Sequence, residues 1–278
     1  MTKEYLIKKD LSKYKEELKI IYHNNFAGNL VEVEKIFDNI LNLEESYGGF
    51  IENQLVNIVC VGVKNIVDNE QTYTIANVCA VATKKEFQNH GYATKLLGHV
   101  FEQLVSKYDS VILQAENWSF YDKHFDLIDN TIKYEYNFIA GEYPTPMIMT
   151  WNEPKNEIIN SIEKNCENNL IGVNNPINYI QSIIDIYQSY GYQFLANPFA
   201  YIWYDQEKKI IDLNYNDVGQ LSWLLNMVQP KDSIWLFDEK IPKELNSLKP
   251  TGKKVIVTKT FAKSKKQFKN IKLIDFFV

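Results

Sequence analysis

The segment VATKKEFQNHGYATKLL at residues 81–97 changes from a strand pattern to a helix pattern within a few residues. Small and β-branched residues at 81–83 predict the end of a strand, and the polar turn that follows contains Gly91. Apolar residues then recur at helical spacing, at positions 93, 96, 97, 100, 101, 104 and 105. The segment therefore predicts a strand, a glycine-containing turn and an amphipathic helix.

A turn of this kind is a candidate anion site. The first N–H groups of a helix lack intrahelical partners and lie at the positive end of its dipole. Here the N–H groups of residues 88–94 would face the ligand, and Gly91 and Ala93 keep side chains small where a pyrophosphate approaches. The GxGxxG pattern of dinucleotide-binding turns and the GxxxxGK[ST] pattern of P-loops are both absent. All 30 basic residues are lysines, so a phosphate site must use backbone N–H groups and lysine.

Composition bounds the class of protein. With 278 residues, 45% of them hydrophobic and 23% charged, the chain predicts a globular protein of two domains. We expect the boundary in the polar stretch at 152–157, which gives domains at 1–151 and 152–278. No run of about 18 apolar residues occurs, and the first residues lack the apolar core of a signal peptide. We therefore expect a cytoplasmic protein without a membrane partner.

Charge and cysteine content exclude further classes. The formal net charge of -5 argues against nucleic-acid binding and favours cationic partners. Cys60, Cys79 and Cys166 are odd in number and lack a CxxC pair, which predicts reduced packing residues rather than a disulfide framework or zinc site. The histidines show no metal-ligand spacing, so no metal is expected.

The flanking sequence predicts a mixed α/β order, β-α-α-β-β-β-α-β-α-β, over residues 4–150. The expected elements are a strand at 5–7, a helix capped by Asp10, a helix at 31–43, a hairpin at 50–63 that turns at 52–54, and strands at 73–83, 111–115, 134–139 and 147–151. The C-terminal half predicts a helix from Pro176, a hairpin turning at 205–209, a helix capped by Asp217, and strands at 234–237, 255–258 and 271–278.

In this order, the segment from Gln88 resembles the acetyl-CoA motif of the GNAT N-acetyltransferases, (R/Q)xxGx(G/A), with Gln88, Gly91 and Ala93 at its defined positions. The resemblance implies the GNAT acyl-CoA acyltransferase fold, an α/β (α+β) architecture with a mixed, mostly antiparallel sheet flanked by helices. It implies acetyl-CoA as co-substrate, with Val81 and Thr83 at the pantetheine arm. The implied pyrophosphate loop is Gln88, Asn89, His90, Gly91, Tyr92, Ala93 and Thr94. Lys84, Lys85 and Lys95 are candidates for the 3′-phosphate, with solvated surface charges as the alternative.

A second resemblance concerns residues 117–123, which are similar to the Asn...Phe-Tyr-x-Lys segment after the fifth GNAT strand. It implies that Tyr121 protonates the departing CoA thiolate and that Asn117 lies at the cofactor. A tyrosine with a pKa of about 10 is protonated at neutral pH and can act as a general acid. The chain has His124-Phe125 where the family has Gly-Phe, which motivates the alternative of a catalytically inactive acyl-CoA-binding or regulatory protein.

The C-terminal half distantly resembles the second, degenerate GNAT repeat of Eis-type acetyltransferases. Its turn before Asp217 lacks the glycine pattern, so we expect no CoA there but a smaller α/β domain that closes the acceptor cleft. The general base is open: Glu116, Glu52 and the terminal carboxylate of Val278, which the Eis resemblance implies, are the candidates.

The sequence thus predicts an N-acetyltransferase that transfers acetyl to a primary amine of a cationic acceptor, such as a polyamine, an aminoglycoside or a lysine side chain of a peptide. The inactive binder and a purely structural pairing module are the alternatives. Oligomeric state, a homodimer included, is left open.

Overall fold

The computed structural model describes residues 4–26, 28–68, 71–115, 120–121, 127–140, 150–165, 176–236 and 248–264. The chain divides into two compact units. The first comprises Met1–Asp129, Leu170–Ser182 and Thr258–Val278, and the second comprises Asn130–Asn169 and Ile183–Val257. Each unit is made of separate stretches of the chain. The expected division into domains at 1–151 and 152–278 stays a prediction.

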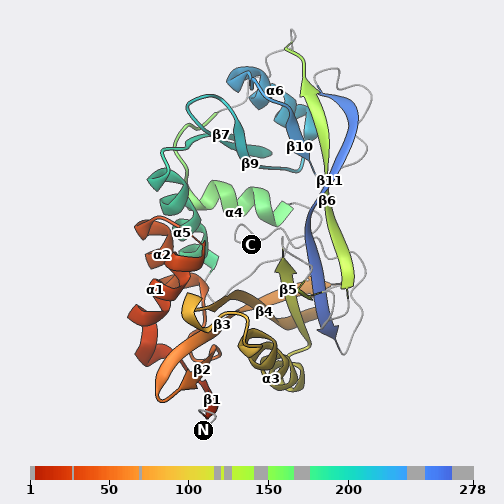
Figure 1. Ribbon diagram of the computed structural model, residues 1–278. Helices are drawn as coiled ribbons and strands as arrows, with labels where there is room; N and C mark the ends of the chain where they lie inside the picture. The colour runs from red at the N-terminus through yellow and green to blue at the C-terminus, as the bar shows by residue number, and fades with distance from the viewer. Residues whose placement is uncertain are drawn as a thin grey trace. The chain divides into compact units, whose positions relative to one another are not determined.

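The first unit is built on a mixed sheet in the order β1-β2-β3-β4-β5-β11. All neighbouring strands with a recorded register run antiparallel except β4 and β5, which are parallel, and this confirms the expected mixed, mostly antiparallel sheet (Figure 1). The strands are β1 (Tyr5–Lys9), β2 (Tyr47–Ile51), β3 (Gln54–Asp68), β4 (Gln71–Thr83), β5 (Ser110–Ala115) and β11 (Leu248–Ser264), which also contributes to the second unit.

The hairpin between β2 and β3 turns where the sequence predicts it. Glu52 and Asn53 both have left-handed backbones, with φ of 49° and 66°, between the paired residues Ile51 and Gln54. Two such residues form the turn whose twist matches the twist of flanking strands. The two strands therefore pair directly through a two-residue connection.

The helices of the first unit are η1 (Ser12–Tyr14), α1 (Lys15–Phe26), α2 (Leu30–Lys35), η2 (Ile36–Ile40), η3 (Lys85–Phe87) and α3 (Tyr92–Lys107). The expected cap at Asp10 is wrong in detail, because its carboxylate accepts from the N–H of Ser12 at 3.1 Å and starts a 3₁₀ turn. The helix expected over 31–43 ends earlier, at Ile40, in a π-helical turn.

Helix α3 packs its apolar stripe on the sheet, as the helical spacing predicts. Leu96, Leu97, Val100, Phe101 and Leu104 are buried and join the core with residues of β3, β4 and β5. Fully burying such a side chain stabilises a fold by about 1.5–3 kcal/mol. The stripe therefore anchors α3 and fixes the position of its N-terminal turn over the sheet.

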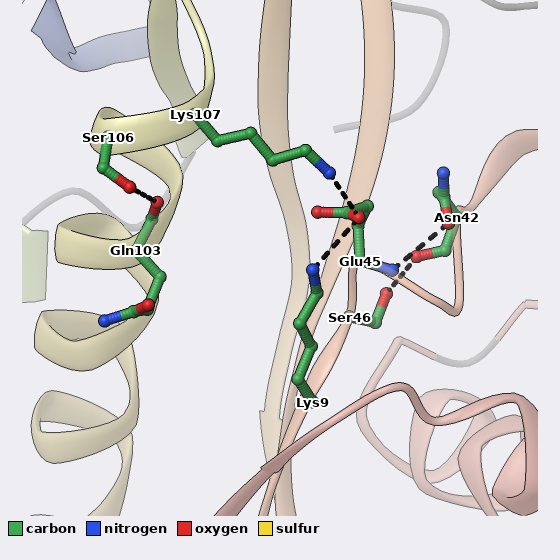
Figure 2. Close-up of polar contacts among 7 residues, drawn as sticks. All are labelled: Lys9, Asn42, Glu45, Ser46, Gln103, Ser106 and Lys107. Atoms are coloured by element: carbon green, nitrogen blue, oxygen red, sulfur yellow. Dashed lines mark hydrogen bonds and ion pairs between the residues drawn. The ribbon is translucent and has the colours of Figure 1, made fainter.

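A buried carboxylate holds the other end of α3. The Oε1 atom of Glu45 lies 3.1 Å from the Nζ atom of Lys9 and 2.6 Å from that of Lys107, and the two lysines approach it from β1 and from the last turn of α3 (Figure 2). Burial alone raises the pKa of Glu45, but the two ion pairs outweigh it and lower the pKa. The contact joins β1, the loop before β2 and the end of α3.

The second unit contains a three-stranded antiparallel sheet, β7-β8-β9, and the pairing of β10 with β6. Asp217 caps α6 as expected, since its carboxylate accepts from the N–H of Gln220 at 3.0 Å. The elements are β6 (Leu127–Phe138), α4 (Asn156–Asn165), α5 (Pro176–Ser189), β7 (Gln193–Asn197), β8 (Ala200–Tyr204), β9 (Ile210–Tyr215), α6 (Val218–Val228) and β10 (Ile234–Leu236); β6 and α5 contribute residues to both units.

Two expected strands lie outside the described residues, at 271–278 and, apart from its last residues, at 147–151. Trp151 forms an isolated antiparallel bridge with Ala196 at the end of β7. Within the described residues, no helix is both long and apolar enough to cross a membrane.

Candidate functional site

Strand β4 separates from β5 before it ends. The parallel register runs from Ile75 opposite Ser110 to Val78 opposite Leu113, whereas β4 continues to Thr83 alongside β3. Ala80 has a left-handed φ of 46° at the point where the β3–β4 register shifts, which marks a bulge. Beyond Val78, the described residues provide no β5 partner for 81–83, so this edge of β4 can pair with an extended ligand.

The turn after β4 leads into a helix end without a capping side chain. Gly91 occupies the cap position with a left-handed φ of 77°, and a Cβ there would meet nothing within 4 Å, so backbone conformation rather than crowding favours glycine. The first intrahelical bond of α3 is donated by the N–H of Lys95 to the Gly91 carbonyl at 3.1 Å. In the described chain, the preceding N–H groups, from Tyr92 to Thr94, have no recorded acceptor and can bind an anion.

The side chains of the turn hold its own backbone. Gln88 donates from Nε2 to the carbonyl of Thr83 at 3.0 Å, and the Nδ1 atom of His90 lies 2.7 Å from the carbonyl oxygen of Gln88. Asn89 adopts a left-handed φ of 64°. Gln88 therefore ties the turn to the end of β4, and the N–H groups that follow it are left for a ligand.

A tyrosine of β1 supports the first turn of α3. The Tyr5 ring stacks on the Tyr92 ring with centroids 4.8 Å apart, and its hydroxyl donates to Oδ1 of buried Asn57 at 3.0 Å. Gly49 of β2 makes room for this contact, because a Cβ there would lie 2.1 Å from both the Tyr5 hydroxyl oxygen and the Asn57 Oδ1 atom. Burial raises the pKa of Tyr5 to about 12, so the hydroxyl remains a donor at neutral pH.

Sequence reasoning missed this support. Tyr5 and Asn57 are 52 positions apart, and only the strand register brings them together. The one local signal is the Gly48-Gly49 pair inside a strand, because glycine in a strand often marks the close approach of another group.

Two of the three candidate phosphate lysines have other contacts. Lys84 forms an ion pair with Glu17 of α1 at 2.7 Å. The Nζ atom of Lys95 lies 4.9 Å from the centroid of the Tyr5 ring, which places a positive charge beside the first turn of α3. Lys85 is exposed on η3.

Tyr121 packs half-buried against the core formed by α3, β4 and β5. Its ring meets Phe120 edge-on, with centroids 5.0 Å apart. Burial raises the pKa of Tyr121 to about 12, which keeps the phenol protonated at neutral pH. The geometry thus brings a proton donor to the same core as the β4 edge and the α3 turn.

The other predicted residues are less informative. Glu52 is exposed in the β2–β3 turn. Glu116, Asn117 and Val278 lie outside the described residues. Among the residues that the structure describes, no group of three histidine, cysteine or acidic side chains has the arrangement of a metal site.

Comparison with known proteins identifies the class of this site. Residues 5–124 match a family model described as an acetyltransferase (GNAT) domain. The matched segment contains β1 to β5, the α3 turn and Tyr121, so the likeness to GNAT acetyltransferases covers the candidate site. The match agrees with the family that the sequence resembles, while the assignment of Gln88, Gly91 and Ala93 to its motif stays a prediction. A comparison with curated proteins finds no match.

Solved structures extend the likeness over both units. A conserved protein from Enterococcus faecalis V583, described as a probable N-acyltransferase, has a TM-score of 0.71 and 15% identity, covering 92% of this chain and 72% of its own. Eis1 from Mycobacterium abscessus has a TM-score of 0.68 and 13% identity over 92% and 73%. A GCN5-related N-acetyltransferase from Kribbella flavida has a TM-score of 0.66 and 11% identity over 94% and 71%. At these identities the likeness confirms the fold.

Proposed function

We propose that the protein transfers the acetyl group of acetyl-CoA to a primary amine. The observation that carries the proposal is the succession of two features: the β4 edge at 81–83, which has no β5 partner among the described residues, and the N-terminus of α3, which has no capping side chain. CoA presents an amide-containing arm and a pyrophosphate, which need an extended hydrogen-bonding edge and a set of N–H donors. β4 and α3 provide these in that order along the chain.

In this proposal, backbone groups of β4 and of the turn before α3 bind acetyl-CoA. The edge at Val81 and Thr83 pairs with the pantetheine amides. The N–H groups from Asn89 to Thr94 bind the pyrophosphate oxygens, whereas the N–H of Gln88 donates to the Lys85 carbonyl at 3.3 Å and is excluded from the predicted loop. The chain contains no arginine, so the positive end of the α3 dipole and nearby lysines supply the charge complement.

The reaction proceeds by direct attack in a ternary complex. The amine nitrogen forms a bond to the thioester carbon, backbone N–H groups at the β4 bulge stabilise the developing oxyanion, and the C–S bond breaks. Tyr121 gives its proton to the departing thiolate, because a neutral phenol is the donor that this step needs. Before the attack, a carboxylate accepts a proton from the acceptor ammonium and leaves a neutral amine, with Glu116, Glu52 and the terminal carboxylate of Val278 as candidates.

The acceptor is proposed to be cationic. The net charge of -5 favours the approach of a small-molecule or peptide amine that carries positive charge. A polyamine, an aminoglycoside and a lysine side chain all meet this requirement.

Thermal unfolding in the presence of acetyl-CoA tests donor binding, with ATP and NAD as controls. A ligand at about one hundred times its Kd adds about 2.7 kcal/mol to the free energy of unfolding. A shift specific to acetyl-CoA supports the proposal, and the amine panel is then screened for release of the CoA thiol. No shift at saturation contradicts it.

Tyr121→Phe separates an enzyme from an inactive binder. We expect kcat to fall about 100-fold or more, the usual contribution of a general acid, while the Kd for acetyl-CoA stays unchanged because only the hydroxyl is removed. Phe120→Leu, a neighbouring change that keeps the hydroxyl, is the control. Donor binding without thiol release from any amine would favour the inactive acyl-CoA-binding protein.

A further inference from the structure

Two of the three cysteines are direct neighbours in the folded chain. Cys60 of β3 and Cys79 of β4 are cross-strand partners in the antiparallel register. Neither is in a disulfide; Cys60 is fully buried, whereas Cys79 is partly accessible. The sequence predicts separate packing residues, and only the register shows the pair.

The strand register places the two thiols within reach of a disulfide bond. Directly opposed residues of antiparallel strands have Cα atoms about 4.5–5.5 Å apart and side chains on the same face, and a disulfide requires about 4.4–6.8 Å. Burial is the main cause that raises the pKa of the Cys60 thiol, and the proximity of Cys79 raises this pKa further. The two sulfur atoms are therefore close enough to influence each other.

The pair lies where β4 leaves β5. Cys79 follows Val78, the last β4 residue in register with β5, and precedes Ala80, whose left-handed backbone forms the bulge. A covalent bond from Cys79 to β3 would act on the backbone immediately before the edge at 81–83.

We propose that Cys60 and Cys79 form a redox pair that closes to an intramolecular disulfide and, by fixing β4 at its bulge, weakens binding of the acetyl donor. The effect on the donor rests on the proposed function. The oxidant is a small disulfide such as oxidised glutathione. Cys79 attacks it as thiolate and releases one glutathione thiol; Cys60 then attacks the Cys79 sulfur and releases the second. The two protein thiols are oxidised, and the small disulfide is reduced to two thiols.

The difference in solvent exposure between the two cysteines determines which thiol reacts first. Cys79 is reachable from solvent and makes the first attack, and buried Cys60 resolves the mixed disulfide. Cross-strand Cβ atoms are about 4.5–5.5 Å apart, beyond the 3.5–4.5 Å of a relaxed disulfide, so closure pulls the strands together. A disulfide under such strain is easily reduced, which suits a reversible switch.

Non-reducing peptide mapping of the full-length chain after treatment with oxidised glutathione tests the bond. We expect a cross-linked pair of peptides containing Cys60 and Cys79, a loss of two hydrogen masses, and a thiol count that falls from three to one. Cys166→Ser should retain the cross-link, and Cys60→Ser and Cys79→Ser should each abolish it. Three intact thiols, or a bond to Cys166, would overturn the proposal. If Cys60→Ser does not fold, peptide mapping of the wild-type chain and of Cys79→Ser, at the partly accessible cysteine, decides the question.

Acetyl-CoA titration of the oxidised and reduced chain tests the consequence. We expect a Kd several-fold higher after oxidation, restored by dithiothreitol, and no redox dependence in Cys79→Ser. Equal Kd values in a chain shown to be cross-linked would overturn the effect on the donor. Failure of both forms to bind acetyl-CoA would contradict the proposed function instead, while the mapping would still decide the disulfide.

Discussion

Helices α3 and α6 each follow a strand, through residues 84–91 and 216–217 respectively, but their N-termini are capped differently. At α3, left-handed Gly91 provides no capping side chain, and among the described residues the N–H groups of Tyr92 to Thr94 have no acceptor. At α6, the Asp217 carboxylate accepts from the N–H of Gln220 and places a negative charge at the helix end. The cap residue thus decides whether a carboxylate occupies the helix N-terminus, and the expectation that CoA binds at α3 only stays a prediction.

The largest effect is expected from placing an aspartate, the cap residue of α6, at the cap position of α3. Gly91→Asp puts a carboxylate where the pyrophosphate would bind, and like charges placed together cost several kcal/mol, so we expect acetyl-CoA affinity to fall about 100-fold or more. Gly91→Asn is the matched control, since asparagine also tolerates a left-handed φ but is neutral. Calorimetric titration measures both. Equal affinities of the two variants would show that backbone strain, not charge, controls the site.

The support beneath α3 predicts the next effect. Tyr5→Phe keeps the stacking on Tyr92 but leaves the buried Oδ1 of Asn57 without its donor, which costs about 1–3 kcal/mol of the free energy of unfolding. Urea unfolding measures the loss, and acetyl-CoA affinity should weaken with it. Tyr190→Phe, at an exposed ring, is the control and should change stability little. An unchanged urea midpoint in Tyr5→Phe would contradict the supporting role.

At α6, removal of the cap should alter stability alone. Asp217→Ala loses the side-chain acceptor for the N–H of Gln220, and such caps contribute about 1 kcal/mol. Thermal unfolding should register this loss, while Asp217→Asn should retain most of the stability. The Kd for acetyl-CoA should equal that of the wild type. A change in that Kd would contradict the comparison, because it would show that the N-terminus of α6 also affects acetyl-CoA binding.

At neutral pH the smallest effect comes from two buried phenols, because both are protonated there and their contribution changes only at alkaline pH. The pKa values of Tyr5 and Tyr121 are raised to about 12 by burial, above the value of about 10 in the unfolded chain. The unfolded chain therefore loses these protons first, so stability is complete below pH 10 and declines as the pH rises towards 12. Replacing both residues by phenylalanine should flatten the decline in alkaline unfolding curves. An identical slope would show that neither phenol is protected from ionisation.

The sequence predicts best where the determinants are local. The periodicity from Ala93 onward and the glycine turn define α3, and Asp217 marks the start of α6, because caps and apolar stripes act within a few residues. The pairing of Cys60 with Cys79 and of Tyr5 with Asn57 depends on strand register, which no local pattern encodes. The bulge at Ala80 is likewise silent in the sequence, since no glycine marks it.

That bulge carries an energetic consequence. An alanine in a left-handed backbone is strained by about 1–2 kcal/mol, and Ala80 holds this conformation at the point where β4 turns away from β5. Glycine would remove the strain, but it would also enlarge the range of backbone conformations at that point. The methyl group of Ala80 therefore lowers the free energy of unfolding, but it also narrows the range of backbone conformations next to the strand edge at 81–83.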